Sequence, residues 1–329
     1  MARDAPKEES PMFNCGKLFR TLAAASLLVL PASWTAALAD DYPSRRVTLI
    51  VPFPPSGGAD ILGRLIAKHM TEVWSQSVVV ENKPGAAGTI GAKAVGSSAP
   101  DGYAILVGAS GSLTPDIAKT LVPVSLLSAP AYIVAVNPSL PVATLTDLIA
   151  YAKANPQKVF FASSGPGSAS HLSGELFMGL TQTQLTHVPY KGMGQAVQDL
   201  IGGQVTVMFG PPPVLLPHVK SGRLKALALA SSERSPLFPE IPTAAEAGLA
   251  GFDAGAWYGL LAPAGTPREV VSKISAETTR ALQKPEVVQA LASIGATPIG
   301  SKPEEFARYL EADIAKWDDI LKKAGVPQK

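Results

Sequence analysis

Hydrophobic positions in the first third of the chain switch between short continuous runs and helical spacing. The run Val47–Val51 predicts a buried strand, because it is short, mostly apolar and rich in β-branched residues. Spacing of three and four residues then predicts one face of a helix, formed by Leu62, Leu65, Ile66, His69 and Val73. Two more strands are expected at 78–80 and 103–107, with a helix opening near Gly85–Gly91 between them. This β-α-β-α-β order predicts a parallel, doubly wound sheet.

A second series of the same kind begins with a strand predicted at Ile133–Val136. Thr144 and Asp147 have the spacing of a capping box and predict the start of a helix that runs through Tyr151. The other elements expected in this series are strands at 159–161, 205–209 and 224–229 and a helix at 168–178. We therefore expect a second sheet, in a second lobe.

The last part of the chain is predicted to be helical. Thr266 with Glu269, and Ser301 with Glu304, have capping-box spacing, with a proline near each helix start. One apolar face is expected on the final helix, made of Phe306, Leu310, Ile314, Trp317 and Leu321. We expect these C-terminal helices to pack back on the first lobe.

Such a return requires the chain to cross between the lobes twice, near Ala131 and near Trp257. The predicted fold class is therefore α/β, with two lobes that are each a doubly wound, mostly parallel sheet. Lobe 1 is expected to comprise residues 40–131 and 258–329, and lobe 2 residues 132–257. Two crossings make a hinge, and ligands tend to bind in the cleft that a hinge creates between lobes.

The N-terminus has the pattern of a cleaved signal peptide. Lys17 and Arg20 precede an apolar run at Leu22–Leu30, and the small-residue triplet Ala37–Ala39 follows that run. The apolar run is shorter than the roughly 20 residues that a membrane-spanning helix needs. We therefore expect residues 1–39 to be a signal peptide that is removed near Ala39, which places the mature protein in the periplasm.

Two residues of this N-terminal region bear on the mature chain. Met12 is an alternative start, which shortens the signal without changing its pattern. Cys15 is the single cysteine of the chain and is expected to leave with the signal. The mature protein is then expected to have no disulfide and no thiolate metal site.

Composition and motifs exclude several classes of function. Lys and Arg number 28 against 26 Asp and Glu, so the net charge of +2 provides no basic excess for binding nucleic acid. Gly108–Gly111 has the wrong spacing for a hydrolase nucleophile elbow. Gly85, Gly88 and Gly91 are spaced G-x-x-G-x-x-G rather than in the G-x-G-x-x-G pattern of a dinucleotide turn. The four histidines are scattered, so we expect no metal, no cofactor and no enzyme activity.

One loop of the first lobe has the chemistry to bind an anion. Pro55-Ser56-Gly57-Gly58-Ala59 lies between a predicted strand and a predicted helix. Glycine allows close approach to the backbone, and the first N–H groups of a helix have no internal partner and favour negative charge. From the residues alone, Gly57-Gly58 is equally well explained as a tight strand-to-helix turn. Asp60 is expected to support the helix start more than to face an anion.

A loop of the second lobe has the same character. Ser164, Gly165, Gly167 and Ser168 lie between a strand and a helix, so two loops, one from each lobe, are placed to bind opposite ends of a dicarboxylate. His171 and Glu175 are four residues apart, which favours a surface or capping pair over a catalytic dyad. Tyr190 is a candidate hydroxyl donor to the ligand, whereas its neighbour Lys191 is interpreted as a solvated charge.

Several segments, in this order and at this spacing, are similar to one protein family. They are Val51–Asp60, Val80–Gly88, Pro100–Tyr103, Gly167–Leu172, Val188–Gly192, Gly202–Val205 and Pro242–Gly248. From about Tyr42 to the C-terminus the chain resembles the solute-binding proteins of tripartite tricarboxylate transporters, the Bug family of periplasmic receptors.

The resemblance implies a two-domain Venus-flytrap receptor that closes on a small organic carboxylate. Its partners are expected to be a small and a large integral membrane subunit of the transporter, and we expect the receptor itself to be a monomer. Family members hold a ligand carboxylate on the first-lobe loop, with the second-lobe loop as the opposing jaw. The ligand-binding residues expected on this basis are Pro55, Ser56, Gly57, Gly58, Ala59, Asp60, Ser164, Gly165, Gly167, Ser168, His171, Tyr190 and Gly210.

The chain departs from the family pattern at four places. Ser56 replaces a glycine, Ala59 replaces a threonine, and Gly210 stands where many members carry aspartate. An acid at that last position would pair with a ligand ammonium group, so its absence argues against amino-acid ligands. The segment Ser110–Pro123 is shorter than the family pattern, which predicts either a more open cleft or an impaired receptor.

Two other functions remain open at this point. The same fold would also serve a sensor that hands its loaded state to a signalling partner. A periplasmic hydrolase would need an acid–base pair in the cleft, and His171 with Glu175 is the one pair that the sequence offers.

Overall fold

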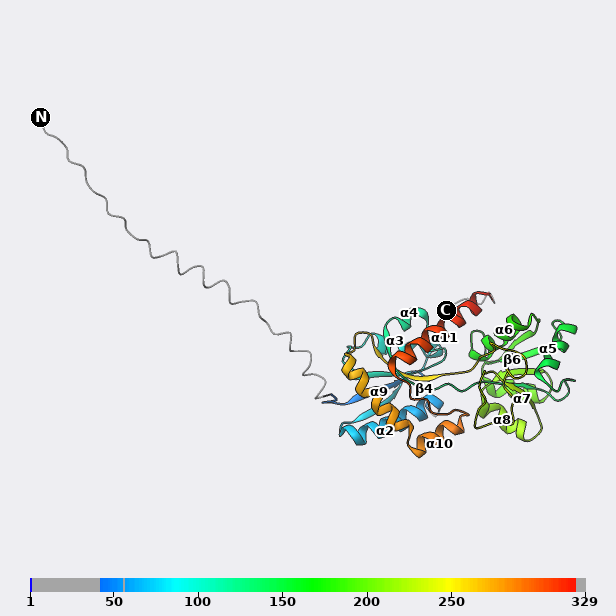
Figure 1. Cartoon of the computed structure of the whole chain (residues 1–329), viewed down its shortest axis with the longest axis horizontal. Helices are drawn as coiled ribbons and strands as arrows, with labels where there is room; N and C mark the ends of the chain where they lie inside the picture. The colour runs from blue at the N-terminus through cyan, green and yellow to red at the C-terminus, as the bar shows by residue number, and fades with distance from the viewer. Residues whose placement is uncertain (2–41, 56, 324–329) are drawn as a thin grey trace. The chain divides into compact units, whose positions relative to one another are not determined.

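The chain forms two five-stranded sheets with helices on both faces, seen in a computed structural model that describes residues 1, 42–55 and 57–323 (Figure 1). The first sheet has the order β2-β1-β3-β10-β4. Its strands are β1 (Val47–Val51), β2 (Val78–Asn82), β3 (Ala104–Ala109), β4 (Leu121–Ser128) and β10 (Tyr258–Pro263). The expected signal peptide, apart from Met1, lies outside the described residues.

The second sheet has the order β7-β6-β8-β5-β9. Its strands are β5 (Ile133–Val136), β6 (Phe160–Ser163), β7 (Thr186–Pro189), β8 (Val207–Gly210) and β9 (Lys225–Leu229). The predicted two-lobed α/β fold class is thereby confirmed. The lobe boundaries stay a prediction.

Each sheet is mixed, with one strand that runs against the other four. In the first sheet β1, β2 and β3 are parallel, whereas β10 runs antiparallel to both β3 and β4. In the second sheet β6, β7 and β8 are parallel, whereas β5 runs antiparallel to β8 and β9. The reason lies in the crossings. Tyr258 starts β10 opposite Ala109 at the end of β3, and Ile133 starts β5 opposite Gly210 at the end of β8, so each entering strand begins where its neighbour ends.

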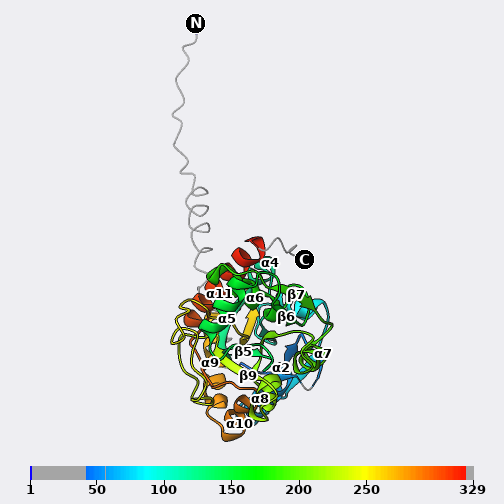
Figure 2. The ribbon, with the colours of Figure 1, turned by 90° about the vertical axis from the view of Figure 1, so that its right-hand side faces the viewer.

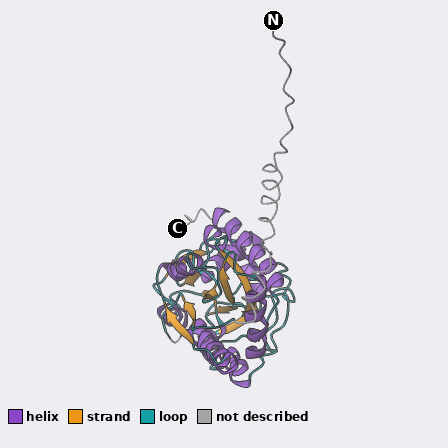
Figure 3. Ribbon diagram, turned by 90° about the vertical axis from the view of Figure 1, so that its left-hand side faces the viewer, coloured by secondary structure: helices purple, strands orange, loops and turns teal. Residues whose placement is uncertain are grey.

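Helices cover both faces of the first sheet (Figure 3). One face packs on α2 (Gly58–Trp74), with α9 (Arg268–Leu282) and α10 (Pro285–Ser293) beside it, and the other on α3 (Thr89–Gly96) and α11 (Pro303–Lys323). A 3₁₀ turn, η1 (Ala86–Gly88), precedes α3, and a short helix, α4 (Pro115–Ala118), precedes β4. The C-terminal helices therefore contact the first sheet, as the sequence predicts. Val73, expected on the buried face of α2, is instead 50% exposed, and the covered face ends at Met70.

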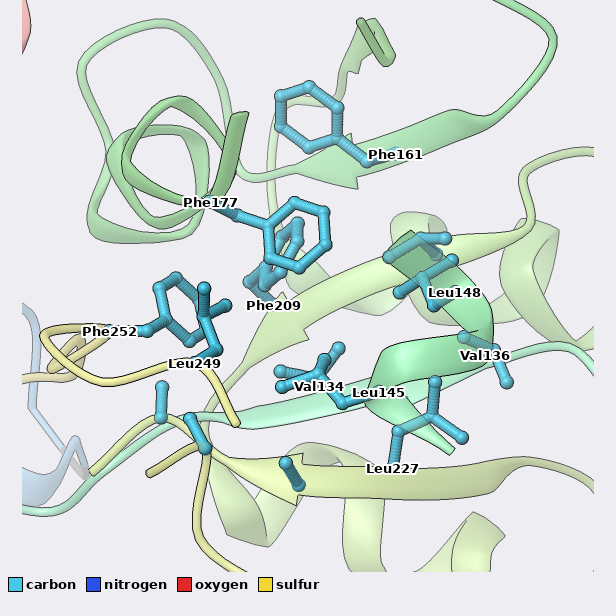
Figure 4. Packing of buried hydrophobic residues seen from close by; sticks show 14 of the residues in the cluster. Val134, Val136, Leu145, Leu148, Phe161, Phe177, Phe209, Leu227, Leu249 and Phe252 are labelled. Atoms are coloured by element: carbon cyan, nitrogen blue, oxygen red, sulfur yellow. The ribbon is translucent and has the colours of Figure 1, made fainter. Parts of the chain in front are cut away.

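Alternating residues divide the second sheet between two hydrophobic clusters. Val134 and Phe209 face α5 (Leu145–Ala154) and α6 (Ala169–Thr181), while Ile133 and Met208 face α7 (Met193–Ile201) and α8 (Pro212–Lys220). Figure 2 shows these two helix pairs on opposite sides of the strands. Within the first cluster, four fully buried phenylalanines form an aromatic core, Phe161, Phe177, Phe209 and Phe252 (Figure 4).

One of the three expected capping boxes forms. Thr144 accepts from the N–H of Asp147, whose carboxylate accepts in turn from the N–H of Thr144. The prediction that Thr266 caps a helix is wrong. Its hydroxyl donates to the carbonyl of Pro263, and the N-cap of α9 is Pro267, which has no side-chain cap bond.

The box expected for Ser301 and Glu304 is also wrong. The Ser301 hydroxyl accepts from the N–H of Leu126 in β4, so it ties the helix to the sheet instead of capping it. The capping carboxylate comes from the next residue, Glu305, which accepts from the N–H of Lys302. The long-range bond to β4 therefore shifts the helix start by one residue relative to the local pattern.

The two crossings pair with each other. Ala131 forms an antiparallel bridge with Gly255, and the N–H groups of Tyr132 and Ala256 donate to the carbonyls of Ala254 and Pro130. A methyl group on Gly255 would lie 2.3 Å from the carbonyl oxygen of Pro130, so glycine is needed for the two segments to approach this closely. The link between the sheets is thus a short two-stranded ribbon, which resists twisting better than two separate strands.

The last helix contacts elements of both sheets. Phe306 and Leu310 of α11 belong to the core of the first sheet, whereas Trp317 packs against a hydrophobic cluster of the second. Asp313 lies between these contacts and accepts from both the Trp257 and the Trp317 indole N–H, at 3.0 and 2.8 Å. The expected apolar face of α11 is therefore shared between two cores, and the side chain of Leu321 lies outside the described residues.

Candidate functional site

The candidate loops lie at the carboxyl edges of the two sheets. In each sheet one strand has parallel neighbours on both sides, β1 between β2 and β3, and β6 between β7 and β8. The loops after two neighbouring parallel strands of this kind turn to opposite faces of the sheet. Ligands of open α/β sheets bind at such a place, in the crevice outside the carboxyl ends of the strands. The first-lobe loop (residues 52–57) follows β1 and the second-lobe loop (residues 164–168) follows β6.

The first-lobe loop presents unpaired backbone donors. Helix α2 begins at Gly58, and its N-cap, Gly57, makes no side-chain cap bond. Within the described residues, the N–H groups of Gly57, Gly58 and Ala59 donate to no other group, while the carbonyl of Gly57 already accepts from Ile61. Three N–H groups at the positive end of a 17-residue helix therefore remain available to an anion. Pro55 is exposed beside them, and Ser56 lies outside the described residues.

Asp60 does not belong to this donor set. Its carboxylate is buried and accepts from Asn82 Nδ2 at 2.9 Å and from Arg64 Nε at 2.9 Å. The same Asn82 amide also donates to the carbonyl of Phe53, and the carboxylate raises the pKa of Arg64. Asp60 thus holds the first-lobe loop against β2, and its place among the ligand-binding residues stays a prediction.

The second-lobe loop uses its own N–H groups internally. Ser164 donates to Ser170 Oγ, Gly165 to Ser163 Oγ, Gly167 to His171 Nδ1, and Ser168 to the carbonyl of Gly165. None of these N–H groups is left to bind an anion. The unpaired donors lie one step further on, because the N–H groups of Ala169 and Ser170 make no hydrogen bond to any described residue. The sequence pattern placed the donors in the loop, whereas the structure places them in the first turn of α6.

His171 organises this loop rather than presenting a free ring nitrogen. Its Nδ1 accepts from Gly167, so the ring proton resides on Nε2, which lies 3.3 Å from Glu175 Oε1. The His171 ring stacks on His187 with centroids 4.0 Å apart, and His187 stacks in turn on Phe161 at 4.9 Å. The His171–Glu175 pair is mostly buried rather than on the surface, with 5% and 20% of the two side chains exposed.

His187 was not anticipated as part of the site. Its Nε2 lies 2.6 Å from Ser163 Oγ, the group that accepts the N–H of Gly165. Burial, with a smaller contribution from the neighbouring His171, lowers the pKa of His187 to about 4. The ring is therefore neutral at physiological pH. It supports the second-lobe loop through Ser163 and adds no charge to it.

Tyr190 and Gly210, two other residues expected to bind the ligand, make contacts within the second lobe. The hydroxyl of Tyr190 donates to Asp199 at 2.7 Å, and burial together with this carboxylate raises the pKa of Tyr190 to about 12. This hydroxyl donates to Asp199 in the structure, and its role as a donor to a ligand stays a prediction. Gly210 ends β8 and is buried, with Leu215 only 3.1 Å from where a methyl group would stand. Close packing against α8 explains this glycine without a ligand.

The shortened segment Ser110–Pro123 is tied to the hinge. The N–H of Trp257 donates to Ser110 Oγ at 2.7 Å, and the N–H of Ser110 donates to the carbonyl of Trp257. The segment then forms α4, capped by Thr114. Two shallow surface hollows, one beside Gln157 and one beside Thr146, include no candidate residue.

Groups for metal binding are not gathered in the part of the chain that the structure describes, where no three His, Cys, Asp or Glu side chains lie together. Among the same residues, no helix combines the length and hydropathy needed to span a bilayer.

Known proteins share this sequence and fold. The family model of the tripartite tricarboxylate transporter family receptor matches residues 62–326. BugT of Bordetella pertussis is 38% identical over 94% of this chain and 99% of its own. A protein in the tcbD-tcbE intergenic region of a Pseudomonas strain is 36% identical over 92% of this chain and 93% of its own.

Solved structures agree. An R. palustris protein with adipate is 36% identical, covers 87% of this chain and 99% of its own, and superimposes with a TM-score of 0.71. MatC from Rhodopseudomonas palustris with bound malate is 35% identical, covers 85% and 100%, and gives a TM-score of 0.69. A TctC solute-binding protein from Polaromonas, 29% identical with 86% and 99% covered, gives a TM-score of 0.78. With the family model covering most of the chain, the protein belongs to the tripartite tricarboxylate transporter receptor family, whose members are periplasmic substrate-binding receptors.

Proposed function

We propose that this protein is a periplasmic receptor that captures a small organic carboxylate by closure of its two lobes and delivers it to a tripartite tricarboxylate-type transporter. The observation that carries the proposal is the pair of unpaired N–H sets, at Gly57–Ala59 and at Ala169–Ser170, each at the start of a helix that follows the central strand of a parallel triplet. Two relatives of more than 30% identity contain adipate and malate, which supports a carboxylate as the ligand.

The mechanism follows from these donors. A carboxylate first binds the N–H groups at the start of α2, where the helix dipole favours its charge. The second carboxylate of a dicarboxylate then meets the N–H groups at the start of α6 when the lobes close about the ribbon at Ala131 and Gly255. Closure is favoured because the closed state adds these contacts. The transporter partners expected are a small and a large integral membrane subunit, and the receptor acts as a monomer.

A hydrolase function is disfavoured by the surroundings of Ser163 and His187, a nucleophile and a base that lie together in the described part of the chain. Ser163 Oγ and His187 Nε2 are 2.6 Å apart, the geometry of an activated serine. Ser163 is fully buried, however, and its hydroxyl is held by the backbone of Gly165, so no ester carbonyl has access to it. His171 and Glu175, the pair that the sequence offered, are committed to the loop.

The test begins with a thermal-shift screen of residues 40–329 against adipate, malate, citrate, benzoate and glutamate. A ligand at a hundred times its dissociation constant stabilises the protein by about 2.7 kcal/mol. No stabilisation by any carboxylate, in a protein that shows a cooperative unfolding transition, would contradict the proposal.

Two substitutions then test the two donor sets separately. Gly57→Pro removes one N–H at a residue whose φ of −79° suits proline, and Gly57→Ala keeps that N–H as the matched control. Ala169→Pro does the same at the first residue of α6, where proline is well tolerated, with Ala169→Ser as control. Each proline variant should bind adipate or malate at least tenfold more weakly than its control in calorimetric titration, at an unchanged melting temperature.

Export is tested independently. Mass spectrometry of the protein purified from the periplasm of an expressing bacterium should show an N-terminus at residue 40. An uncleaved chain found in the cytoplasm would contradict the expected signal peptide.

A further inference from the structure

The side chain of Tyr258 lies against the start of α2. A methyl group placed on Gly58 would be 2.8 Å from the Tyr258 hydroxyl oxygen and 3.1 Å from Cζ. Heavy atoms at such separations overlap, so the tip of the tyrosine occupies the space that a side chain at position 58 would need. The glycine at the first residue of α2 is therefore explained by Tyr258, and the hydroxyl lies beside the unpaired N–H groups of the helix start.

This hydroxyl has no partner in the part of the chain that the structure describes. Among the described residues nothing donates to it or accepts from it, although the side chain is largely shielded from solvent. Ser128 pairs with Tyr258 across β4 and β10, and its fully buried Oγ also lacks a hydrogen bond. Two shielded hydroxyls on paired residues thus make no hydrogen bond to any described residue, and polar groups of this kind call for a partner.

The position in the fold favours a ligand as that partner. Tyr258 is the first residue of β10 and pairs with Ala109, the last residue of β3, so it lies at the carboxyl edge of the first sheet, on the same side as the first-lobe loop. It also follows directly on Trp257, where the second crossing enters the sheet. A carboxylate bound to the N–H groups of Gly58 and Ala59 thus lies within reach of this hydroxyl.

We propose that Tyr258 contacts the ligand directly, and that its hydroxyl donates a hydrogen bond to the carboxylate bound at the start of α2. The inference rests on the proposed function and adds a side-chain donor to a donor set otherwise made of backbone. It also gives the site a preference. Tyrosine supplies an O–H donor that a charged oxygen accepts more strongly than a neutral one, so carboxylates gain over esters and amides of the same shape.

Burial favours this role. It raises the pKa of Tyr258, so the hydroxyl keeps its proton well above neutral pH and remains a donor. The same holds for Tyr132 at the first crossing, where burial is the larger cause and Tyr258 the smaller. No negative charge therefore arises on these rings to repel a carboxylate.

The experiment removes the hydroxyl alone. Tyr258→Phe keeps the ring, and Tyr103→Phe is the matched control, because the Tyr103 hydroxyl bonds Ser44 at the opposite end of β3. Wild type and both variants are titrated calorimetrically with adipate, with malate and with the monomethyl ester of adipate. The melting temperature without ligand is measured for each.

The expected result is a loss of roughly ten- to a hundredfold in affinity for adipate and malate in Tyr258→Phe, the size of a hydrogen bond to a charged group. Tyr103→Phe should bind as wild type does, and Tyr258→Phe should unfold at the wild-type temperature. The monomethyl ester keeps one carboxylate for this site, so its affinity should fall by a similar factor in Tyr258→Phe. Wild-type affinity in Tyr258→Phe would overturn the inference and leave the proposed function intact. Failure of the wild type to bind any carboxylate would overturn both.

Discussion

The backbone N–H of Gly167 donates to Nδ1 of His171 at 3.1 Å, which closes the second-lobe loop on the helix that follows it. This bond uses a donor that would otherwise face a ligand, and it determines which ring nitrogen of His171 carries the proton. It also connects the loop to a stack of three rings, His171, His187 and Phe161, that ends in the aromatic core.

The acceptor at position 171 is expected to be essential to the loop. His171→Ala leaves the N–H of Gly167 without a partner and should lower the free energy of unfolding by about 1–3 kcal/mol. His171→Asn places an amide oxygen near the position of Nδ1 and should recover most of that loss. Denaturant unfolding measures both, and calorimetric titration should show weaker ligand binding in the alanine variant alone. Equal behaviour of the two variants would contradict an acceptor role for this residue.

Stability should depend on pH through His187. Its pKa is about 4 in the folded protein against about 6.5 when unfolded, so between these values the unfolded chain binds more protons. The free energy of unfolding is therefore at its full value above pH 6.5 and decreases as the pH falls toward 4. Chemical denaturation at pH 4.5 to 7.5 measures this slope.

His187→Gln provides the control for that slope. Glutamine keeps a polar group near Ser163 and does not titrate, so the variant should lose less stability than wild type over the same pH range. A wild-type slope in His187→Gln would assign the pH dependence to other groups.

Replacing Asp60 and replacing Arg64 should have very different effects on the free energy of unfolding, although the two residues form one ion pair. The carboxylate is buried and accepts from Asn82 as well, so Asp60→Ala should lower the free energy of unfolding by about 1.5–3 kcal/mol. The Arg64 side chain is 53% exposed, so Arg64→Ala should cost less than about 1 kcal/mol. Thermal unfolding of both variants checks the difference. Similar losses in the two would show that the Asn82 bond contributes little.

Asp313 should hold the last helix between the two cores. Its two oxygens accept from separate indole N–H groups, so Asp313→Asn leaves Trp257 or Trp317 facing an amide donor and should cost about 1–3 kcal/mol. Asp318→Asn on the same helix, where Lys322 is a largely exposed partner, should cost less than about 1 kcal/mol. The melting temperatures of the two variants measure this difference. Equal decreases in Asp313→Asn and Asp318→Asn would contradict the bridging role of Asp313.

Sequence patterns located the strands that are short, apolar and β-branched, such as Val47–Val51 and Ile133–Val136, with their bounds nearly correct. They did not locate β4 or β10. Pro123 interrupts the pattern of β4, and β10 contains Gly259, a residue that weakens strand prediction. The structure explains that glycine, because a methyl group there would lie 2.3 Å from Phe306 of α11. Such a requirement comes from a residue 47 positions later and leaves no local signal.

For the candidate site too, the local features could be predicted from the sequence, whereas the long-range contacts could not. Glycine- and serine-rich turns before helices marked the two loops, because backbone donors need little more than a turn and a helix start. The support from His187 and the hydroxyl of Tyr258 depend on pairings between distant strands. A local pattern contains no information on those pairings.

The position of β10 determines the order in which the chain can fold. In the first sheet β3 and β4 do not pair with each other, since β10 lies between them and bonds to both. When residues 1–131 have emerged from the ribosome, the first sheet therefore still lacks β10, the strand that lies between β3 and β4. All the strands of the second sheet emerge before residue 258, so that sheet can assemble first, and the first sheet closes only after its last strand appears. A chain with this topology stays incomplete until most of it has been synthesised.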